Sequence, residues 1–181
     1  MKLNLKETFI SENPADSILE NSRRQVENAV FSFANPKKTK APKVLHVSPE
    51  MASELNISEE ETTSEFFKKI VTGNEIYPNT KPFAMCYGGH QFGNWAGQLG
   101  DGRAINLFEV EHKNKNWKVQ LKGAGETPYS RTADGLAVLR SSVREYLCSE
   151  AMFHLGVPTT RALSLSLSGD DVLRDVLYNG N

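Results

Sequence analysis

The sequence predicts an α+β protein in which one long helix packs on a small antiparallel sheet. Residues 103–112, RAINLFEVEH, are rich in β-branched and aromatic side chains, which favours a strand. Residues 117–122, WKVQLK, alternate strictly between apolar and polar side chains, so they predict a second strand with one buried face. Residues from about 135 to 155 have apolar side chains at helical spacing and are followed by Gly156, which predicts a long helix.

Shorter elements are predicted before this core. The VLHV segment at residues 44–47 predicts a strand, and Ser48, followed by proline, is typical of a helix start. Ser58 and Glu61 have the spacing of a capping box, which predicts a second helix that ends near Gly73.

The long helix has apolar residues on more than one side, so we expect it to lie between two layers. The four polar residues at 113–116 predict a hairpin loop before this helix, and residues 161–168 predict a last strand after it. Asp134 is a candidate N-cap for the helix. A helix between two layers would partly desolvate Arg144 or Glu145, or both, and a desolvated charge needs a partner.

Composition and charge exclude several classes of protein. The chain has 21 Lys and Arg against 22 Asp and Glu, so no overall field attracts nucleic acid or anionic lipid. No segment approaches the roughly 20 apolar residues of a membrane span. Its two cysteines lack the Cys-x-x-Cys spacing, and its four histidines are scattered and predict no metal site. We expect a cytoplasmic protein with no nucleic-acid or membrane partner.

Six of the 13 glycines lie within residues 88–103. Such a cluster allows positive φ angles or the close approach of another group to the main chain. Gly97 and Gly102 have the G-x-x-x-x-G spacing of a Walker phosphate loop. However, Arg103 and Ala104 replace the expected Lys and Ser or Thr, and a predicted strand follows where that motif needs a helix.

A kinase-like arrangement fits better, because its three parts occur in the required order. These are a glycine turn at Gly100–Gly102, a lysine on the next strand at Lys122, and a glutamate on the following helix at Glu145. The turn amides and Arg103 would hold phosphate oxygens, and Glu145 would hold Lys122 beside them. The alternative is a glycine turn that only packs against another layer, with Lys122 simply solvated.

Four strings of residues resemble the selenoprotein O family of kinase-like protein adenylyltransferases. They are GGHQFGNWAGQLGDGRA, QLKGAGETPYSRTADG, AVLRSSVREYLCSEAM and LGVPTTRAL, within residues 83–163. The resemblance implies transfer of AMP from ATP to Ser, Thr or Tyr hydroxyls of proteins, with Mg²⁺ as the metal. It therefore favours a nucleotide over internal packing as the reason for the glycines, and it implies ATP and protein substrates as partners.

The resemblance also assigns site residues. By position, Gly100, Gly102 and Arg103 correspond to the family's phosphate loop, and Lys122 corresponds to its phosphate-contacting lysine. Glu145 corresponds to the ion-pair partner of that lysine. Asp134 and Gly135 correspond to two further nucleotide contacts. Leu136 departs from the family pattern, which usually has arginine there, and this removes a cation near the nucleotide.

The resemblance predicts a division into residues 1–82, an N-terminal extension with two short helices, and residues 83–181, a kinase-like nucleotide-binding N-lobe truncated before the second lobe. It implies that the general base and the Mg²⁺ ligands follow Asn181, so no catalytic residue or metal ligand is expected in this chain. We expect the chain alone to be inactive and its exposed lobe face to favour self-association. The competing interpretation is a non-catalytic module that binds a nucleotide or a partner protein.

Overall fold

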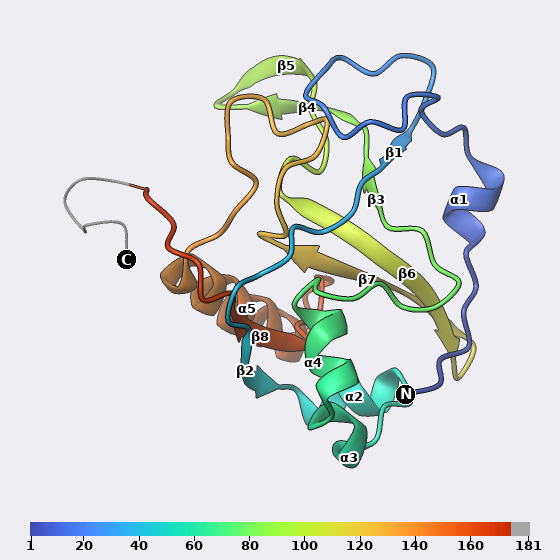
Figure 1. The fold of residues 1–181 in the computed structure, drawn as a ribbon, viewed down its shortest axis with the longest axis vertical. Coiled ribbons are helices and arrows are strands. Elements are labelled where there is room, and N and C mark those ends of the chain that lie inside the picture. Colours follow the sequence, from blue (N-terminus) through green and yellow to red (C-terminus); the bar gives the residue numbers. More distant parts are fainter. Residues whose placement is uncertain (175–181) are drawn as a thin grey trace.

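The computed structural model describes residues 1–174 and shows an α+β fold with three small antiparallel sheets (Figure 1). In chain order the elements are α1 (Thr8–Glu12), β1 (Phe31–Phe33), β2 (Lys43–Val47), α2 (Pro49–Glu54), α3 (Glu59–Thr62), α4 (Glu65–Val71), β3 (Phe83–Met85), β4 (Gly88–Gln91), β5 (Asn94–Gln98), β6 (Ala104–His112), β7 (Lys115–Lys122), α5 (Leu139–His154) and β8 (Ser164–Leu167). The last part of the predicted 83–181 lobe, residues 175–181, lies outside the described residues.

The largest sheet has the strand order β1-β3-β6-β7. Its centre is the predicted β6–β7 hairpin, in which Ala104 pairs with Lys122 and His112 pairs with Lys115. The loop is shorter than the four residues predicted. Lys113 and Asn114 alone form it, with φ angles of 50° and 59°, which suit a type I′ turn that matches the twist of the strands.

Strands from both ends of the chain complete the sheets. Strand β1 pairs with β3, and β2 pairs with β8 in a separate two-stranded sheet. Near the amino end, Leu5 forms a bridge with Val110 of β6. Strand pairs therefore join residues before position 82 to residues after it.

One face of the β6–β7 hairpin covers the main core. As the alternation in β7 predicts, Trp117, Val119 and Leu121 pack against this core. Helices α2 and α4 lie on the same side. The fully or nearly fully buried members from α4 and β6 are Phe67, Ile70, Leu107, Phe108 and Val110.

The predicted helix caps are present. The Ser48 side chain accepts a hydrogen bond from the Met51 amide at the start of α2, and Ser58 forms the capping box with Glu61. The single helix expected after Ser58 is two helices, however. Ser64 caps α4 separately by accepting from the Phe67 amide. The Thr62, Thr63 and Ser64 hydroxyls donate to main-chain carbonyls of α3, a local alternative that interrupts helices.

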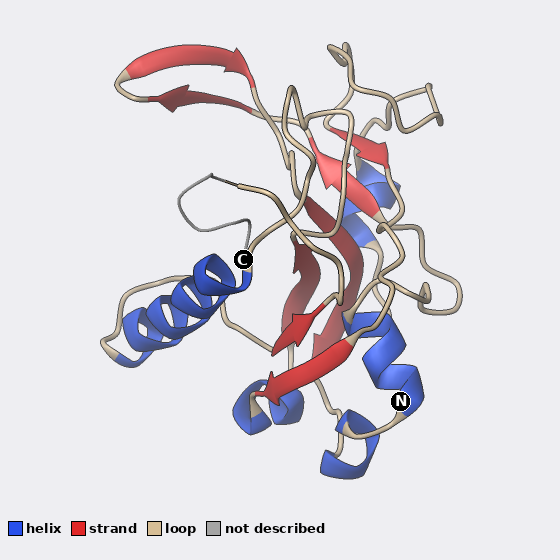
Figure 2. Ribbon diagram, turned by 60° about the vertical axis from the view of Figure 1, so that its left-hand side comes forward, coloured by secondary structure: helices blue, strands red, loops and turns tan. Residues whose placement is uncertain are grey.

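Helix α5 differs from its prediction in two ways. It begins at Leu139 rather than near 135, and its N-cap residue Val138 makes no side-chain hydrogen bond. It contacts β8 and, through side chains, β2 and α2, and none of its residues is buried. Figure 2 shows the helix at the margin of the fold. Leu147, for example, is 62% exposed. The prediction that this helix lies between two layers is therefore wrong within residues 1–174.

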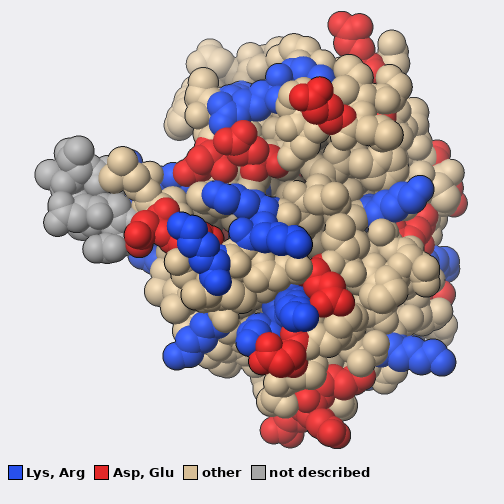
Figure 3. All heavy atoms as spheres, in the orientation of Figure 1, with Lys and Arg blue, Asp and Glu red and all other residues tan. Residues whose placement is uncertain are grey.

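Surface charge is mixed, as the near-zero net charge suggests. On the face in Figure 3, Lys and Arg side chains lie between groups of Asp and Glu. No helix of residues 1–174 is long and apolar enough to cross a membrane.

Candidate functional site

A cleft of about 690 Å³ brings together residues that are far apart in the sequence. They come from the segment before β6, from the end of β7 and from the loop that precedes α5. Six of the seven residues that the sequence analysis selects line this cleft: Gly100, Gly102, Arg103, Lys122, Asp134 and Gly135. Its volume is within the range of small-molecule sites.

Glu145 does not line the cleft but contacts it through Lys122. The Lys122 Nζ lies 4.0 Å from Glu145 Oε2, so the expected ion pair is present. The two side chains are 48% and 52% exposed, and the expectation that Glu145 is desolvated is therefore wrong. An exposed pair of this kind contributes about 0–1 kcal/mol to stability.

The glycine cluster forms a hairpin and a separate connection. The hairpin is β4–β5, with Phe92 and Gly93 at its tip, where the φ angles are 52° and 80°. The Gly100–Gly102 segment links β5 to β6, which belong to different sheets. It is therefore not the turn between two paired strands that a kinase-like arrangement predicts.

Most main-chain amides of this segment are already used. The Asp101 amide donates to the Met85 carbonyl at 2.9 Å, and the Gly102 amide donates to the Gly100 carbonyl at 2.8 Å. The prediction that the Gly100–Gly102 amides together form the main anion site is therefore wrong for these two. A Cβ atom at Gly100 would lie 2.5 Å from Tyr129 Cγ, so this glycine allows the protein to pack closely on itself.

Asp101 fixes the segment, and the sequence analysis did not select it. Its buried carboxylate accepts hydrogen bonds from the Met85 amide at 3.0 Å, from Asn106 Nδ2 at 3.0 Å and from Gln120 Nε2 at 3.4 Å. The sequence signal that could have identified Asp101 is an acid between two glycines, followed by polar residues on two predicted strands. A buried carboxylate with three donors holds the cleft wall in one position.

Two cations face the cleft with capacity to bind an anion. Arg103 is exposed, and its guanidinium forms no hydrogen bond or ion pair with residues 1–174. Lys122 has only its distant partner Glu145. A third cation, Arg131, has a positive φ of 54° and donates from Nη1 to Gln91 Oε1 at 3.0 Å. It thereby connects the loop before α5 to the β4–β5 hairpin.

Asp134 is held by a residue that the sequence analysis missed. Arg174 donates to both of its carboxylate oxygens at 2.7 Å, and the Leu136 amide donates to Oδ1 at 3.0 Å. The hydrogen bonds from Arg174 lower the pKa of Asp134 to about 2. Its neighbour Gly135 has a φ of 72°, and a Cβ there would lie 2.0 Å from the Gly125 carbonyl oxygen. These contacts explain why α5 does not start here and why Asp134 is not its N-cap.

The described part of the cleft does not fit a magnesium ion. Its two carboxylates, Asp101 and Asp134, are both engaged by protein donors. Mg²⁺ prefers carboxylate oxygens that are free to coordinate it. We therefore assign no Mg²⁺ ligand among residues 1–174.

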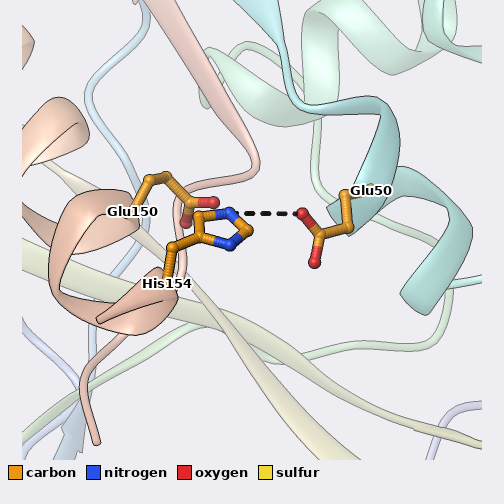
Figure 4. Close-up of side chains that lie close together, drawn as sticks. All are labelled: Glu50, Glu150 and His154. Atoms are coloured by element: carbon orange, nitrogen blue, oxygen red, sulfur yellow. Dashed lines mark ion pairs between the residues drawn. The ribbon is translucent and has the colours of Figure 1, made fainter. Parts of the chain in front are cut away.

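A second group of ionisable side chains lies between α5 and α2. Glu50, Glu150 and His154 have ligand atoms within 4.8 Å of one another, and His154 Nε2 lies 3.6 Å from Glu50 Oε2 (Figure 4). The nearly buried Arg161 donates to Glu150 through two nitrogens at 3.0 and 2.9 Å and lies 3.2 Å from Glu50. Because the Arg161 guanidinium already pairs with both carboxylates, we interpret this group as an ion-pair network and not as a metal site.

Comparison with known proteins identifies one matching family and several similar proteins. A family model described as "Protein adenylyltransferase SelO" matches residues 18–177. The chain is similar to proteins named "Protein nucleotidyltransferase YdiU". It is 65% identical to the one from Flavobacterium johnsoniae over 99% of its length, 59% identical to that from Rhodopirellula baltica over 96%, and 54% identical to that from Tolumonas auensis over 99%. It spans about a third of the length of each relative: 34%, 32% and 34%.

Proposed function

The chain belongs to the protein adenylyltransferase SelO family, and on this premise we propose that it forms the ATP-binding part of an enzyme that transfers AMP to protein hydroxyls. The observation that supports the proposal is the cleft. Six residues from three separate segments, each predicted from the sequence, line one concave site of nucleotide size. The order of glycine segment, lysine strand and glutamate helix supports a kinase-like lobe for this part.

In this proposal, Arg103 and Lys122 bind the phosphates. Both cations line the cleft, and Arg103 has no competing partner within residues 1–174. Glu145 limits the directions in which Lys122 extends, because its carboxylate lies 4.0 Å from the ammonium group. Charge-assisted hydrogen bonds to phosphate oxygens are the stronger kind, so these two side chains supply most of the binding.

AMP transfer joins a hydroxyl oxygen of the acceptor to the α-phosphorus of ATP and releases pyrophosphate. The family resemblance implies a general base that takes the hydroxyl proton and a metal that offsets charge on the phosphates. Asp101 and Asp134 are engaged by protein donors and serve neither role in the described residues. We therefore expect residues 1–181 alone to bind ATP in the millimolar range, about 4 kcal/mol, without transferring AMP.

The proposal is tested by calorimetric titration of ATP into the wild-type chain and two variants. Arg103→Ala removes the unpartnered cation and should weaken binding by roughly 1.5–3 kcal/mol, the usual value for a charged hydrogen bond. Lys115→Ala is the control, because Lys115 pairs with Glu54 at 3.0 Å outside the cleft and carries the same charge. Equal affinities of the wild type and Arg103→Ala would contradict the assignment.

The second candidate function is a module that binds a nucleotide but catalyses no reaction, even within a longer chain. It is favoured because the carboxylates of Asp101 and Asp134 already accept hydrogen bonds from protein donors. Labelled ATP, Mg²⁺ and a generic protein acceptor distinguish the two. The full-length Flavobacterium johnsoniae relative should label the acceptor, and residues 1–181 should not. A longer chain that contains residues 1–181 and still fails to label would favour the binding module.

A further inference from the structure

We propose that Arg174 is a positioning residue of the nucleotide site, which offsets the charge of Asp134 and fixes its carboxylate in the cleft. The inference rests on the proposed function and deepens it. Arg174 and Asp134 both line the cleft, although 40 residues separate them in the sequence. No motif in the sequence indicates this arginine.

The hydrogen bonds show how Arg174 acts. Its Nη1 donates to Asp134 Oδ2 at 2.7 Å and to the Leu173 carbonyl at 3.0 Å, and its Nη2 donates to Asp134 Oδ1 at 2.7 Å and to the Leu136 carbonyl at 2.8 Å. Each terminal nitrogen carries two N–H groups, so both nitrogens are fully used. Both terminal nitrogens of Arg174 are thus committed to Asp134 and to main-chain carbonyls, which supports action through Asp134.

This arrangement resolves an electrostatic conflict in the site. A carboxylate beside a triphosphate repels it, and Asp134 lies in the same cleft as the phosphate-binding candidates. A bidentate arginine offsets that charge and also fixes the direction of the carboxylate oxygens. The remaining lone pair on Asp134 Oδ2 suits a hydrogen-bond donor, so its partner on a nucleotide would be a ribose hydroxyl or an exocyclic amino group.

The pair also holds the turn that lines the cleft. The Arg174 side chain is 28% exposed and that of Asp134 is 41% exposed, so both remain accessible from solvent. The bond from Nη2 to the Leu136 carbonyl holds the 134–136 turn from its other end. The other charged side chains that line this cleft are Asp101, Arg103, Lys122 and Arg131.

The first test is independent of nucleotide binding. Carbon-13 NMR of the Asp134 carboxyl should show its pKa near 2 in the wild type and close to the ordinary value of about 3.9 in Arg174→Gln. Arg174→Lys keeps the charge without the bidentate geometry, so its Asp134 pKa should lie between these values. An unchanged pKa in Arg174→Gln would overturn the proposal. Circular dichroism of each variant shows whether it is folded.

The second test measures ATP affinity by titration. Arg174→Gln and Asp134→Asn should each weaken binding by about tenfold, and the double variant should lose no more than either single variant. Lys115→Gln, which removes a paired cation outside the cleft, should bind as the wild type does. A double variant weakened by about a hundredfold would mean that Arg174 contacts the nucleotide independently, and this overturns a positioning role.

The outcomes separate the two proposals. If Arg103→Ala weakens ATP binding and Arg174→Gln does not, the positioning role fails and the nucleotide site stands. If the wild-type chain binds no ATP at millimolar concentration, the proposed function fails and the role of Arg174 in it fails as well.

Discussion

The ammonium group of Lys122 lies 4.0 Å from Glu145 Oε2, and this ion pair joins the last residue of β7 to helix α5. Both side chains are about half exposed, so the pair adds little to stability. Its effect is instead on direction, because it limits where the lysine extends within the cleft.

Glu145→Gln should therefore separate stability from binding. We expect the free energy of unfolding to change by less than about 1 kcal/mol, because the pair is solvated. ATP affinity should fall several-fold, since Lys122 loses the group that directs it. Urea unfolding and calorimetric titration measure the two effects. Glu111→Gln is the control, because Glu111 pairs with Lys6 at 3.5 Å in a similarly exposed setting. A loss of stability above about 2 kcal/mol would show that the pair is structural.

Gly100→Ala should destabilise the fold before any ligand is considered. The added Cβ would lie 2.5 Å from Tyr129 Cγ and 2.7 Å from the Met85 carbonyl oxygen, at a φ of 143°. We expect a loss of roughly 2–4 kcal/mol, from overpacking together with backbone strain. Gly97→Ala is a matched control, because Gly97 also has a positive φ, of 72°, but no atom lies within 4 Å of its added Cβ. If urea unfolding gives the same loss for both variants, close packing is not the reason for Gly100.

Asp101→Ala should loosen the cleft wall. The variant removes the acceptor of the Met85 amide and one of the two acceptors of Asn106 Nδ2 and of Gln120 Nε2. An unsatisfied buried donor costs about 1–3 kcal/mol, so a loss of at least roughly 2 kcal/mol is expected by urea unfolding. Amide hydrogen exchange should also be faster at Met85. Exchange as slow as in the wild type would indicate that Asp101 does not hold this strand.

The ion-pair network around Arg161 should make stability depend on pH. The hydrogen bonds from Arg161 lower the pKa of Glu150 in the folded protein. A group whose pKa is lower in the folded state contributes stability above its unfolded pKa of about 4.3 and loses it as the pH falls through the folded pKa. Glu150→Gln should thus be less stable than the wild type by roughly 2 kcal/mol at pH 7, and the difference should shrink below about pH 4.

Urea unfolding between pH 7 and pH 3 measures this dependence. Glu65→Gln is the control, because Glu65 pairs with Lys68 at 2.7 Å but is 76% exposed. A difference between Glu150→Gln and the wild type that stays constant with pH would contradict the assignment.

Local features of the fold could be predicted from the sequence, because they depend on neighbouring residues. The Ser58 and Glu61 capping box and the alternation in β7 each follow from spacing alone. The start of α5 could not. Asp134 has the chemistry of an N-cap, but its oxygens are taken by Arg174 and by the Leu136 amide. One of these partners lies 40 residues away, where spacing gives no information.

The candidate site could likewise be predicted from the sequence only in part. Six of the seven residues selected from the kinase-like order and from the family resemblance line one cleft, and their role in binding a nucleotide stays a prediction. The reason for the glycines was only partly predicted. Gly100 and Gly135 lie against Tyr129 and the Gly125 carbonyl, and such contacts depend on how distant segments pack. The apolar stripes of α5 likewise indicated burial, but a sequence does not show which layer covers each stripe.

The pairing of β2 with β8 affects how this protein is made. Val47 pairs with Ser164, and the Ser48 amide donates to the Leu163 carbonyl at 2.8 Å. During translation, β2 is synthesised more than a hundred residues before β8, an interval of roughly 6–25 s at 5–20 residues per second. Strand β2 is an unpaired edge during that interval, and unpaired edges invite contact with other chains. Early chaperone binding near residues 43–47 would protect the nascent chain until β8 emerges.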